Sequence, residues 1–436
     1  MSMQVAARQP FCYIWDMKID EQYISPTVRK GLGLLSEINK RGFEAYIAGG
    51  AVRDLVIRQL DMMPESDLNM SEDADVHDVD IATNMPIEDL KLAFRCDSNN
   101  GEAHGTILVH YEGLVFEVTQ FRVDGDYSDG RHPDSVKFTD SFKEDCARRD
   151  FTINAMGLGK DLNVIDYFGG IDDLVFRILR AVGNPYTRFS EDSLRVIRGM
   201  RFAARFGLAV DSLTGMAMKR SINYVKNVAM ERIHDELYKC AGYGPWQFAR
   251  MVEYMDKYGF AEVFSSLGLC LERQRLMVDS LPISANPDYV MATFICMLPE
   301  ESMEFLRCTR KEIRMADRIR NGVMDVMSGK FGTDNDRIVH SVELYASPWF
   351  SIVSALCKEI NPHCTAITQD MLLTCQRIVH FRKSEPEYGK KVMAEGIKGG
   401  PEFGKRLKEL MREDYCRIRD EQVNMSYGRM PLRGMW

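Results

Sequence analysis

The sequence predicts an α/β domain followed by a long all-helical part, and three observations support this division. Between residues 25 and 157, short runs typical of strands, such as EAYIA, GTILVHY and LVFEVTQF, alternate with Gly-rich turns and helical patterns. From about Asp172 onward we expect no further strands, because helical periodicity continues to the end and is broken at sites such as GYGP, residues 242–245. At roughly 150 residues per domain, the length of 436 residues suggests about three modules.

Composition and cysteine usage exclude several classes of protein. Hydrophobic residues make up 45% and charged residues 28%, as in ordinary globular proteins, and no apolar run approaches the ~18 residues that a membrane helix requires. The N-terminal residues lack the basic start, apolar stretch and cleavage site of a secretory signal, so we expect a cytoplasmic protein. The eleven cysteines form no CxxC pair and the eight histidines no HExxH, so we expect no zinc site.

Charge is distributed unevenly along the chain. The net charge is −8, whereas residues 376–436 hold fourteen Lys and Arg against nine Asp and Glu. Taken alone, this basic tail is typical of a solvated helical surface. Because nucleic-acid binding depends on local rather than total charge, the overall acidity does not exclude an RNA partner.

Two carboxylates stand two residues apart in the run DVDIAT, residues 78–83. On a strand, residues at this spacing point to the same face, so Asp78 and Asp80 project together while Val79 and Ile81 face the core. Close carboxylates repel one another unless a cation joins them, and hard oxygen ligands suit Mg²⁺. The pair alone also fits a turn that faces water, so the neighbouring motifs decide between the two interpretations.

The preceding stretch, AYIAGGAVRDLVIRQL, indicates a phosphate site. A strand that ends in Gly49 and Gly50 lets the backbone approach a ligand, and the following helix offers free N–H groups and the positive end of its dipole. Arg53 adds a charged donor in the first turn. A plain strand-to-helix junction has the same pattern, but together with Asp78 and Asp80 it predicts a site for a nucleoside triphosphate and a metal.

Glu117 and the segment that follows it carry two interpretations each. Glu117 lies among apolar residues of the strand LVFEVTQFR, so it is either on the solvent face or a third acid near the metal. Residues 122–138 are rich in Gly, Asp and Arg, which is typical of a mobile loop beside a site and also of an inert linker.

The run EDSLRVIRGMRFAARF, residues 191–206, predicts one helix with a basic face and a core face. At about 100° per residue, its arginines fill an arc of roughly 120° opposite Val196 and Met200, and Asp192 neighbours the first of them in the first turn. These arginines are Arg195, Arg198, Arg201 and Arg205. In isolation the helix is typical of an amphipathic helix whose arginines meet solvent or structural acids.

Six motifs follow one another between residues 44 and 240: GGAVRD, DVDIAT, FRVDGDYSDGRHPDSVKF, RRDFTINAM, EDSLRVIRGMRFAARF and ERIHDEL. In this order they resemble the class II transfer-RNA nucleotidyltransferases, the CCA-adding enzymes, together with their bacterial poly(A) polymerase relatives. A weaker similarity continues in GIKGGPEFGKRLKEL near the C-terminus. The resemblance implies an α/β nucleotidyltransferase head of the DNA polymerase β type, followed by an all-α neck, body and tail.

The resemblance also implies domain boundaries and a departure from the family pattern. We expect an N-terminal extension at residues 1–24, the catalytic head at 25–157, a helical neck with the nucleotide-template helix at 158–240, and an RNA-binding body and tail at 241–436. In the family a short loop separates GGAVRD from DVD, whereas here residues 61–77 form an acidic insert. Neither the insert nor the extension is explained by the resemblance.

The site residues follow from the motifs that match the family. The resemblance implies Mg²⁺ on Asp78 and Asp80, with Glu117 as a further catalytic candidate. The expected nucleotide-binding residues are Gly50, Arg53, Arg149, Asp150, Asp192, Arg195, Arg198 and Arg201. Of these, Arg149 suits a phosphate and Asp150 can accept a hydrogen bond from a ribose hydroxyl.

The resemblance makes the helix of residues 191–206 an amino-acid template for the incoming base. Arg195 supplies only donors and ionised Asp192 only acceptors, so the pair satisfies cytosine or adenine. Uracil and guanine carry an N–H where the arginine needs an acceptor, and a donor facing a donor is strongly disfavoured. We expect ERIHDEL, with Glu231, Arg232 and Glu236, to be an ion-paired brace near this helix and not catalytic.

The implied activity is the addition of C, C and A from CTP and ATP to the 3′ end of transfer RNA. The terminal 3′-hydroxyl attacks the α-phosphorus and pyrophosphate leaves, while the basic tail holds the RNA along its phosphates. Three alternatives remain: an A-adding transfer-RNA nucleotidyltransferase, a poly(A) polymerase, and a catalytically inactive RNA-binding protein. The last would not need Asp78, Asp80 and Asp192 all intact.

Overall fold

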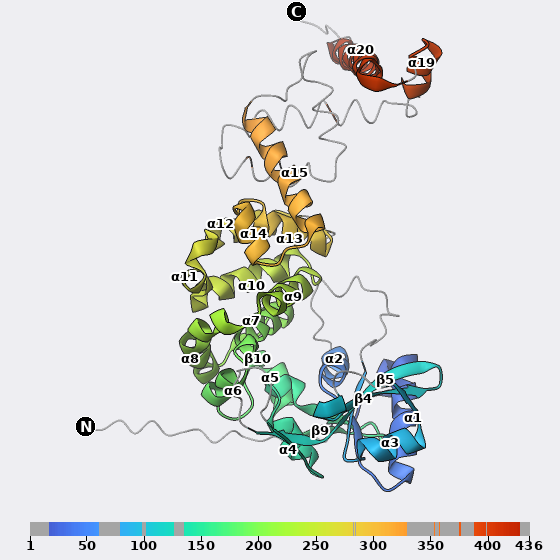
Figure 1. Cartoon of the computed structure of the whole chain (residues 1–436), viewed down its shortest axis with the longest axis vertical. Coiled ribbons are helices and arrows are strands. Elements are labelled where there is room, and N and C mark those ends of the chain that lie inside the picture. The colour runs from blue at the N-terminus through green and yellow to red at the C-terminus, as the bar shows by residue number, and fades with distance from the viewer. Residues whose placement is uncertain are drawn as a thin grey trace, which may run out of the picture. The chain divides into compact units, whose positions relative to one another are not determined.

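The computed structural model divides into two compact units, residues 1–272 with 305–307 and residues 273–304 with 308–436 (Figure 1). The residues that it describes are 17–60, 79–97, 102–125, 135–281, 283, 285–328, 353, 357, 375, 388–397 and 399–427. The acidic insert, the first sixteen residues and Asp78 therefore lie outside the described residues. The predicted boundaries at residues 157 and 240 both fall inside the first unit and stay predictions.

A mixed sheet forms the α/β part of the first unit, with the strand order β3-β4-β5-β2-β1-β8-β9. The strands are β1 (Ala45–Ala48), β2 (Asp80–Thr83), β3 (Arg95–Asp97), β4 (Thr106–Tyr111), β5 (Leu114–Gln120), β8 (Met156–Leu158) and β9 (Val164–Asp166). Strands β2 and β5 pair in parallel, and the other neighbours pair antiparallel. The four strands predicted from EAYIA, DVDIAT, GTILVHY and LVFEVTQF are confirmed.

Among the described residues, four helices accompany the sheet, and the first begins at a clear capping signal. They are α1 (Pro26–Lys40), α2 (Gly50–Gln59), α3 (Ile87–Ala93) and α4 (Phe142–Ala147), with the short turns η1 (Glu21–Tyr23), η2 (Glu102–His104) and η3 (Thr152–Asn154). Ser25 caps α1 by accepting from the N–H of Val28, and Pro26 occupies the first helical position. Strands β6 (Arg122–Asp124) and β7 (Val136–Phe138) form a separate hairpin.

One hydrophobic core of the sheet lies on the face that α1 covers. The buried residues Val28, Leu34 and Leu35 line one side of α1. Its Gly31 approaches the sheet so closely that an added Cβ would lie 3.1 Å from Val79 and 3.4 Å from Ile47. Because side chains alternate along a strand, Ala48 and Ala82 point to the opposite face, where they pack with Phe121 and Phe142 in a second buried cluster.

The N-terminal segment extends the sheet at its β9 edge. Lys18 bridges to Asn163, and the N–H of Ile19 donates to the carbonyl of Leu162 at 2.9 Å. The side chain of Gln59, at the end of α2, accepts from the N–H of Asp20 and donates to the carbonyl of Lys18. Residues 17–20 therefore tie the sheet edge to α2, the helix that carries GGAVRD.

The rest of the first unit is mainly helical, as predicted. Its helices are α5 (Gly170–Val175), α6 (Pro185–Glu191), α7 (Leu194–Phe206), α8 (Ser212–Ser221), α9 (Met230–Ala241), α10 (Pro245–Tyr258) and α11 (Phe260–Val263), with the turns η4 (Ile222–Asn227) and η5 (Ser265–Leu267). The expectation that strands stop at about Asp172 is wrong in detail. Strands β10 (Ile178–Leu179) and β11 (Ala209–Val210) pair in parallel. Two residues are too few for alternation to reveal a strand.

The run of residues 191–206 is not one helix. Helix α6 ends at Glu191, Asp192 is extended with φ −143° and ψ 105°, and α7 begins at Leu194. The carboxylate of Asp192 accepts from the N–H of Leu194 at 3.0 Å. Aspartate competes with helical backbone in this way, so the prediction that Asp192 lies in the first turn of the helix is wrong.

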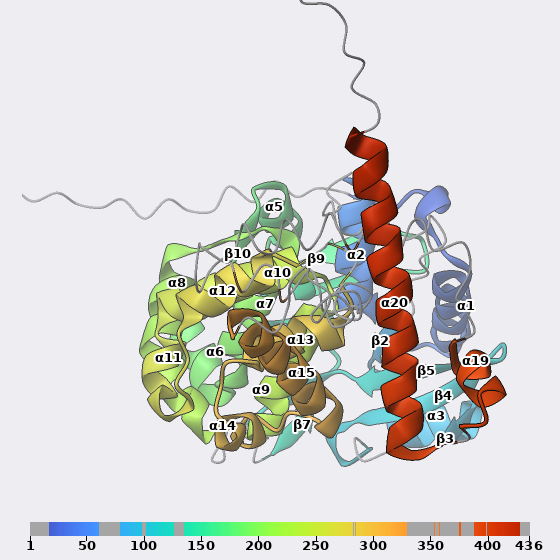
Figure 2. The ribbon, with the colours of Figure 1, turned by 90° about the horizontal axis from the view of Figure 1, so that it is seen from above.

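The second unit is helical wherever the structure describes it. Its elements are α12 (Leu271–Asp279), α13 (Pro287–Ile295), α14 (Glu300–Phe305), α15 (Arg310–Met327), α19 (Tyr388–Ala394) and α20 (Gly400–Tyr427), of which α12 and α14 cross the division between the units. Helix α19 packs beside α20 (Figure 2), and the Tyr388 hydroxyl donates to Asp414 at 2.7 Å. None of the described helices is long and apolar enough to cross a membrane.

Candidate functional site

Two carboxylates lie on neighbouring strands, on the face of the sheet opposite α1. In the parallel ladder Ile81 pairs with Val118, so one step earlier Asp80 of β2 stands beside Glu117 of β5. Ile81 and Val118 are buried on the core face, whereas Asp80 and Glu117 are both exposed on the other. Glu117 is therefore on the solvent face and on the strand next to Asp80, and its role as a third acid near a metal stays a prediction. Asp78 lies outside the described residues.

The turn between β1 and α2 leaves room for an arginine. Asp80 pairs with Ala48, the last residue of β1, so the turn follows directly beside the carboxylates. Gly49 has φ +76°, and an added Cβ there would lie 2.9 Å from Nη1 of Arg149. Any other residue would be strained and would displace Arg149. Gly50 opens α2, whose N-terminus points its backbone N–H groups out of this turn.

Arg149 is partly buried, and its side chain is 20% exposed. Its Nη2 donates to Asp145 at 3.2 Å and its Nη1 to the carbonyl of Asn154 at 3.3 Å. Burial disfavours the charged form of Arg149, but Asp145 outweighs burial and raises its pKa. Among the described residues, no acceptor lies within hydrogen-bond distance of its buried Nε. A buried donor without a partner is costly, so this Nε is a candidate donor to a bound ligand.

Arg53 lies inside the protein and not at its surface. It is 5% exposed, its Nη1 donates to Asn154 Oδ1 at 2.6 Å, and its Nε donates to Asp54 at 2.8 Å. The guanidinium also stacks over Phe206 at 4.7 Å. Burial lowers its pKa from the usual value, and Asp54 opposes this effect. In this arrangement Arg53 links α2 to α7. To bind a nucleotide as predicted, its guanidinium would have to leave Asn154 or Asp54.

Asp150 has both carboxylate oxygens engaged within the protein. Oδ1 accepts from the N–H of Phe151 at 2.8 Å and from Asn154 at 3.0 Å, while Oδ2 accepts from Arg198 at 2.9 Å. Burial disfavours its charge, but Arg198 and Asn154 outweigh burial and lower its pKa to about 2. Asp150, the predicted acceptor for a ribose hydroxyl, thus links the RRD segment to α7 through Arg198.

We expect the stability that Asp150 contributes to disappear in acid. Its pKa is about 2 in the folded chain and about 3.9 in an unfolded one. A carboxylate with a lowered pKa stabilises fully above its unfolded value, and this contribution, on the order of 2 kcal/mol, is lost as the pH falls through the folded value. The difference in unfolding free energy between wild type and Asp150→Asn should therefore shrink between about pH 5 and pH 2. A difference that stays constant over this range would contradict the assignment.

The arginines of α7 face acidic partners from other elements. Arg195 donates to Glu191 at 2.6 Å, Arg198 pairs with Asp150 at 2.8 Å, and Arg201 donates to Glu236 at 2.6 Å. The fourth, Arg205, lies 3.8 Å from Asp54. The predicted basic face exists, but ion pairs cover it.

The two predicted base-selecting residues are each held by another residue. Asp192 accepts from Arg232 at 2.9 Å, and Arg195 is fixed by Glu191 and by the carbonyls of Arg148 and Arg188. Their side chains are 15% and 11% exposed. The carboxylate keeps acceptor capacity and the guanidinium keeps unused N–H groups, so both can still meet a base edge.

The brace predicted for ERIHDEL is confirmed. On α9, Arg232 pairs with Asp192, Glu236 pairs with Arg201, and Glu231 pairs with Arg307 at 3.0 Å. Prediction from sequence missed Asp145, Asn154, Glu191 and Tyr243, which hold the site arginines. Asp145 and Asn154 flank the RRD motif, and this proximity is the one signal that could have indicated them.

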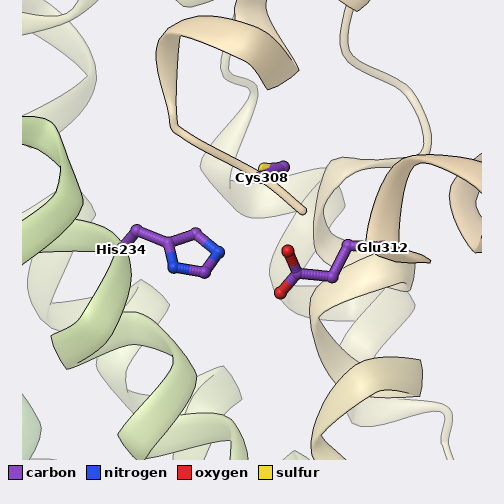
Figure 3. Close-up of side chains that lie close together, drawn as sticks. All are labelled: His234, Cys308 and Glu312. Carbon is purple, nitrogen blue, oxygen red and sulfur yellow. The ribbon is translucent and has the colours of Figure 1, made fainter. Parts of the chain in front are cut away.

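The three residues labelled in Figure 3 are of types that can bind metals, and they come from two different units. His234 lies on α9 of the first unit and stacks on Tyr238, with ring centroids 6.2 Å apart. Glu312 lies in the first turn of α15, shortly after Cys308, in the second unit. Glu312 accepts from the N–H of Thr309 and its own N–H donates to the Thr309 hydroxyl, a reciprocal cap at the start of the helix.

Comparison with known proteins places the chain beside one group of enzymes. Residues 45–180 match the family model of the poly A polymerase head domain. The CCA-adding enzyme of Streptococcus agalactiae is 35% identical over 271 residues, which cover 62% of this chain and 62% of that enzyme. The CCA-adding enzyme of Latilactobacillus sakei is 31% identical over 393 residues, which cover 89% of this chain and 94% of that enzyme. The match to the first relative thus spans less than two thirds of its length.

Solved structures confirm the fold. The Bacillus stearothermophilus CCA-adding enzyme in complex with CTP superposes with a TM-score of 0.60 at 24% identity, covering 93% of this chain and 100% of that one. The Thermotoga maritima CCA-adding enzyme complexed with transfer RNA superposes with a TM-score of 0.62 at 17% identity, covering 94% and 98%. The predicted fold class, a nucleotidyltransferase head followed by an all-helical part, is confirmed.

Proposed function

Because the chain belongs to the family of CCA-adding enzymes, we propose that it adds C, C and A from CTP and ATP to the 3′ end of transfer RNA and releases pyrophosphate. The observation that carries the proposal is the placement of Asp80 and Glu117 beside each other on the exposed sheet face, next to the turn of Gly49. Such a constellation suits phosphoryl transfer, which needs charge neutralisation and positioning more than a covalent group. A transfer-RNA substrate agrees with the cytoplasmic location predicted from the sequence.

The family generally uses divalent metal ions, and we propose Mg²⁺ for this chain. Asp80 is exposed, and its carboxylate oxygens, like those of Asp78 two residues earlier in the sequence, are of the hard type that this ion prefers. Bound there, Mg²⁺ would favour ionisation of the RNA 3′-hydroxyl and offset charge on the pyrophosphate. Glu117 stands close enough in the sheet to hold a third position or a water.

The triphosphate is proposed to lie against the turn between β1 and α2. The N-terminal N–H groups of α2 can donate to phosphate oxygens there. The unpartnered Nε of Arg149, packed against Gly49, supports this position because a phosphate oxygen would satisfy it. Four further residues of the predicted site contact other protein side chains and hold α2, the RRD segment, α7 and α9 together. We propose that they affect nucleotide binding by fixing these elements. They are Arg53, Asp150, Arg198 and Arg201.

Base selection is proposed to rest on Asp192 and Arg195. Glu191 and Arg232 fix these side chains from behind, so the selecting edge is rigid before a nucleotide arrives. Rigid donors and acceptors discriminate more strongly than mobile ones, because a mismatched base leaves buried groups unpaired. The helices of the basic tail are proposed to hold the transfer RNA by its backbone.

One assay separates the proposed function from its alternatives. The purified chain is incubated with transfer RNA that ends before CCA or in CC, with each labelled triphosphate singly and in pairs, and product length is measured. Full CCA addition predicts two C residues from CTP and a single terminal A that follows them. An A-adding enzyme would extend only the CC-ending RNA, a poly(A) polymerase would make long A tracts from ATP alone, and an inactive RNA-binding protein would bind without extension.

A further inference from the structure

A closed ring of polar contacts joins α2 to α7, α9 and the turn after α9. Four of its nine members are arginines, and each of these guanidinium groups contacts a polar neighbour on either side in the ring. We call it the polar ring, and its members in order are Asp54, Arg53, Asn154, Asp150, Arg198, Glu236, Arg201, Tyr243 and Arg205. Every member belongs to the first unit.

One arc of the polar ring crosses from α2 to α7 through the RRD segment. Arg53 donates to Asn154 at 2.6 Å, Asn154 donates to Asp150 at 3.0 Å, and Asp150 accepts from Arg198 at 2.9 Å. Arg198 lies 3.7 Å from Glu236 on α9. This arc contains the buried carboxylates that fix the middle of α7.

The second arc returns from α9 to α2 through a single hydroxyl. Glu236 accepts from Arg201 at 2.6 Å, and the Tyr243 hydroxyl then accepts from Arg201 at 3.1 Å and from Arg205 at 3.3 Å. Arg205 lies 3.8 Å from Asp54 and so closes the ring. Among these contacts, the Tyr243 hydroxyl is the neutral group on which two arginines one turn apart converge.

The polar ring surrounds two aromatic rings of α7. Phe202 and Phe206 stack with centroids 6.4 Å apart. The guanidinium of Arg201 lies 4.2 Å from the centroid of Phe202, and that of Arg53 lies 4.7 Å from the centroid of Phe206. A guanidinium stacked on an aromatic face and held at its edges by acceptors has little freedom to turn.

The GYGP turn positions the Tyr243 hydroxyl beside Arg201 and Arg205. Gly242 ends α9, and Gly244 has φ +117°, a conformation that side chains rarely adopt, before Pro245 opens α10. The Tyr243 ring also lies 4.3 Å from the guanidinium of Arg205. The sequence marks these residues only as a break between helices, whereas the structure gives the tyrosine partners on α7.

We propose that Tyr243 is a positioning residue for nucleotide selection, whose hydroxyl keeps α7 in register with α2. This inference rests on the proposed function. Asp192 and Arg195 stand at the start of α7, while Asp80 and the turn of Gly49 belong to the sheet and α2. The base edge and the phosphates of one nucleotide must reach both places together. A rigid helix transmits any rotation of its C-terminal turns, where Arg201 and Arg205 lie, to its first turn.

The test compares Tyr243→Phe with Tyr254→Phe in the full chain. Tyr254 on α10 is a matched control, because its hydroxyl donates to the carbonyl of Leu208 at 2.9 Å outside the polar ring. For each protein, kcat/KM is measured for CTP and for UTP on transfer RNA that ends before CCA. The ratio of the two values does not depend on how much of the protein is folded, so loss of stability alone leaves it unchanged.

We expect Tyr243→Phe to lower the preference for CTP over UTP about fivefold, since two charged donors lose one shared acceptor. Tyr254→Phe should keep the preference within about twofold of wild type. Arg205→Lys, which keeps the charge near Asp54 but loses the guanidinium geometry, should reproduce the effect, and the double variant should add little to either single one. This second variant decides the question if Tyr243→Phe does not fold.

Two results would overturn the inference alone. In the first, both Tyr243→Phe and Arg205→Lys prefer CTP over UTP as strongly as the wild type does. The other is an equal loss of preference in Tyr254→Phe, which would make the effect a general consequence of removing a hydroxyl near α7. A wild-type chain that extends the RNA with neither nucleotide would overturn the proposed function and this inference with it.

Discussion

Asp80→Ala is expected to lower the rate of nucleotide addition by about a thousandfold, with little change in stability. Asp80 is exposed on the face of the sheet opposite α1, on the strand next to Glu117 and next to the end of β1. Removing it takes away a proposed metal ligand, whose contribution of several kcal/mol is made mainly in the transition state. The measurement is single-turnover extension of transfer RNA that ends before CCA, at saturating CTP.

The matched control for Asp80→Ala is Glu88→Ala on α3. Glu88 is also an exposed acid of the head, with a side chain that is 82% exposed and lies 3.7 Å from Lys91. Both variants should unfold within about 1 kcal/mol of wild type, because both residues are exposed and polar contacts in solvent contribute little to stability. Extension by Asp80→Ala at the wild-type rate would show that the carboxylate holds no essential metal and would remove the basis of the proposed chemistry.

The strands and the turn of the site could be predicted from the sequence because their signals are local. The alternation around β2 placed Asp80 on the face opposite Ile81, and two glycines marked the turn before α2, whereas two interpretations of Glu117 stayed open. The sequence did not predict that β2 and β5 are neighbours. Strand pairing depends on contacts across the whole head, and the parallel pair joins segments that β3 and β4 separate along the chain.

Helix α7 shows the same limit at the level of side chains. The period of 3.6 residues gave the basic face of α7 correctly, but it carries no information about what covers that face. The partners of Arg198 and Arg201 are Asp150 and Glu236, which are 48 and 35 residues away in the chain. The start of the helix was misplaced because Asp192 turns its carboxylate to the backbone, a local choice that periodicity does not register.

Glu236→Gln is expected to lower the unfolding free energy of the first unit by about 3 kcal/mol. Glu236 is 2% exposed and accepts from Arg201 at 2.6 Å, with Arg198 at 3.7 Å on its other oxygen. The neutral amide keeps one acceptor but removes the charge that compensates a buried guanidinium, since Arg201 is only 5% exposed. Breaking one side of a buried ion pair costs far more than the pair contributes net, because the remaining charge stays in a poorly solvated place.

Glu231→Gln on the same helix separates burial from ion pairing. Glu231 also pairs with an arginine, Arg307 at 3.0 Å, but the two side chains are 62% and 60% exposed. Exposed pairs contribute at most about 1 kcal/mol, so this variant should unfold close to wild type. Urea denaturation gives the free energies, and hydrogen exchange of the α7 amides should rise in Glu236→Gln alone, because α9 holds α7 through Glu236. If both variants lost the same small amount, the buried pair would not brace the template helix, and α7 would owe its position to the apolar packing of Phe202 and Phe206.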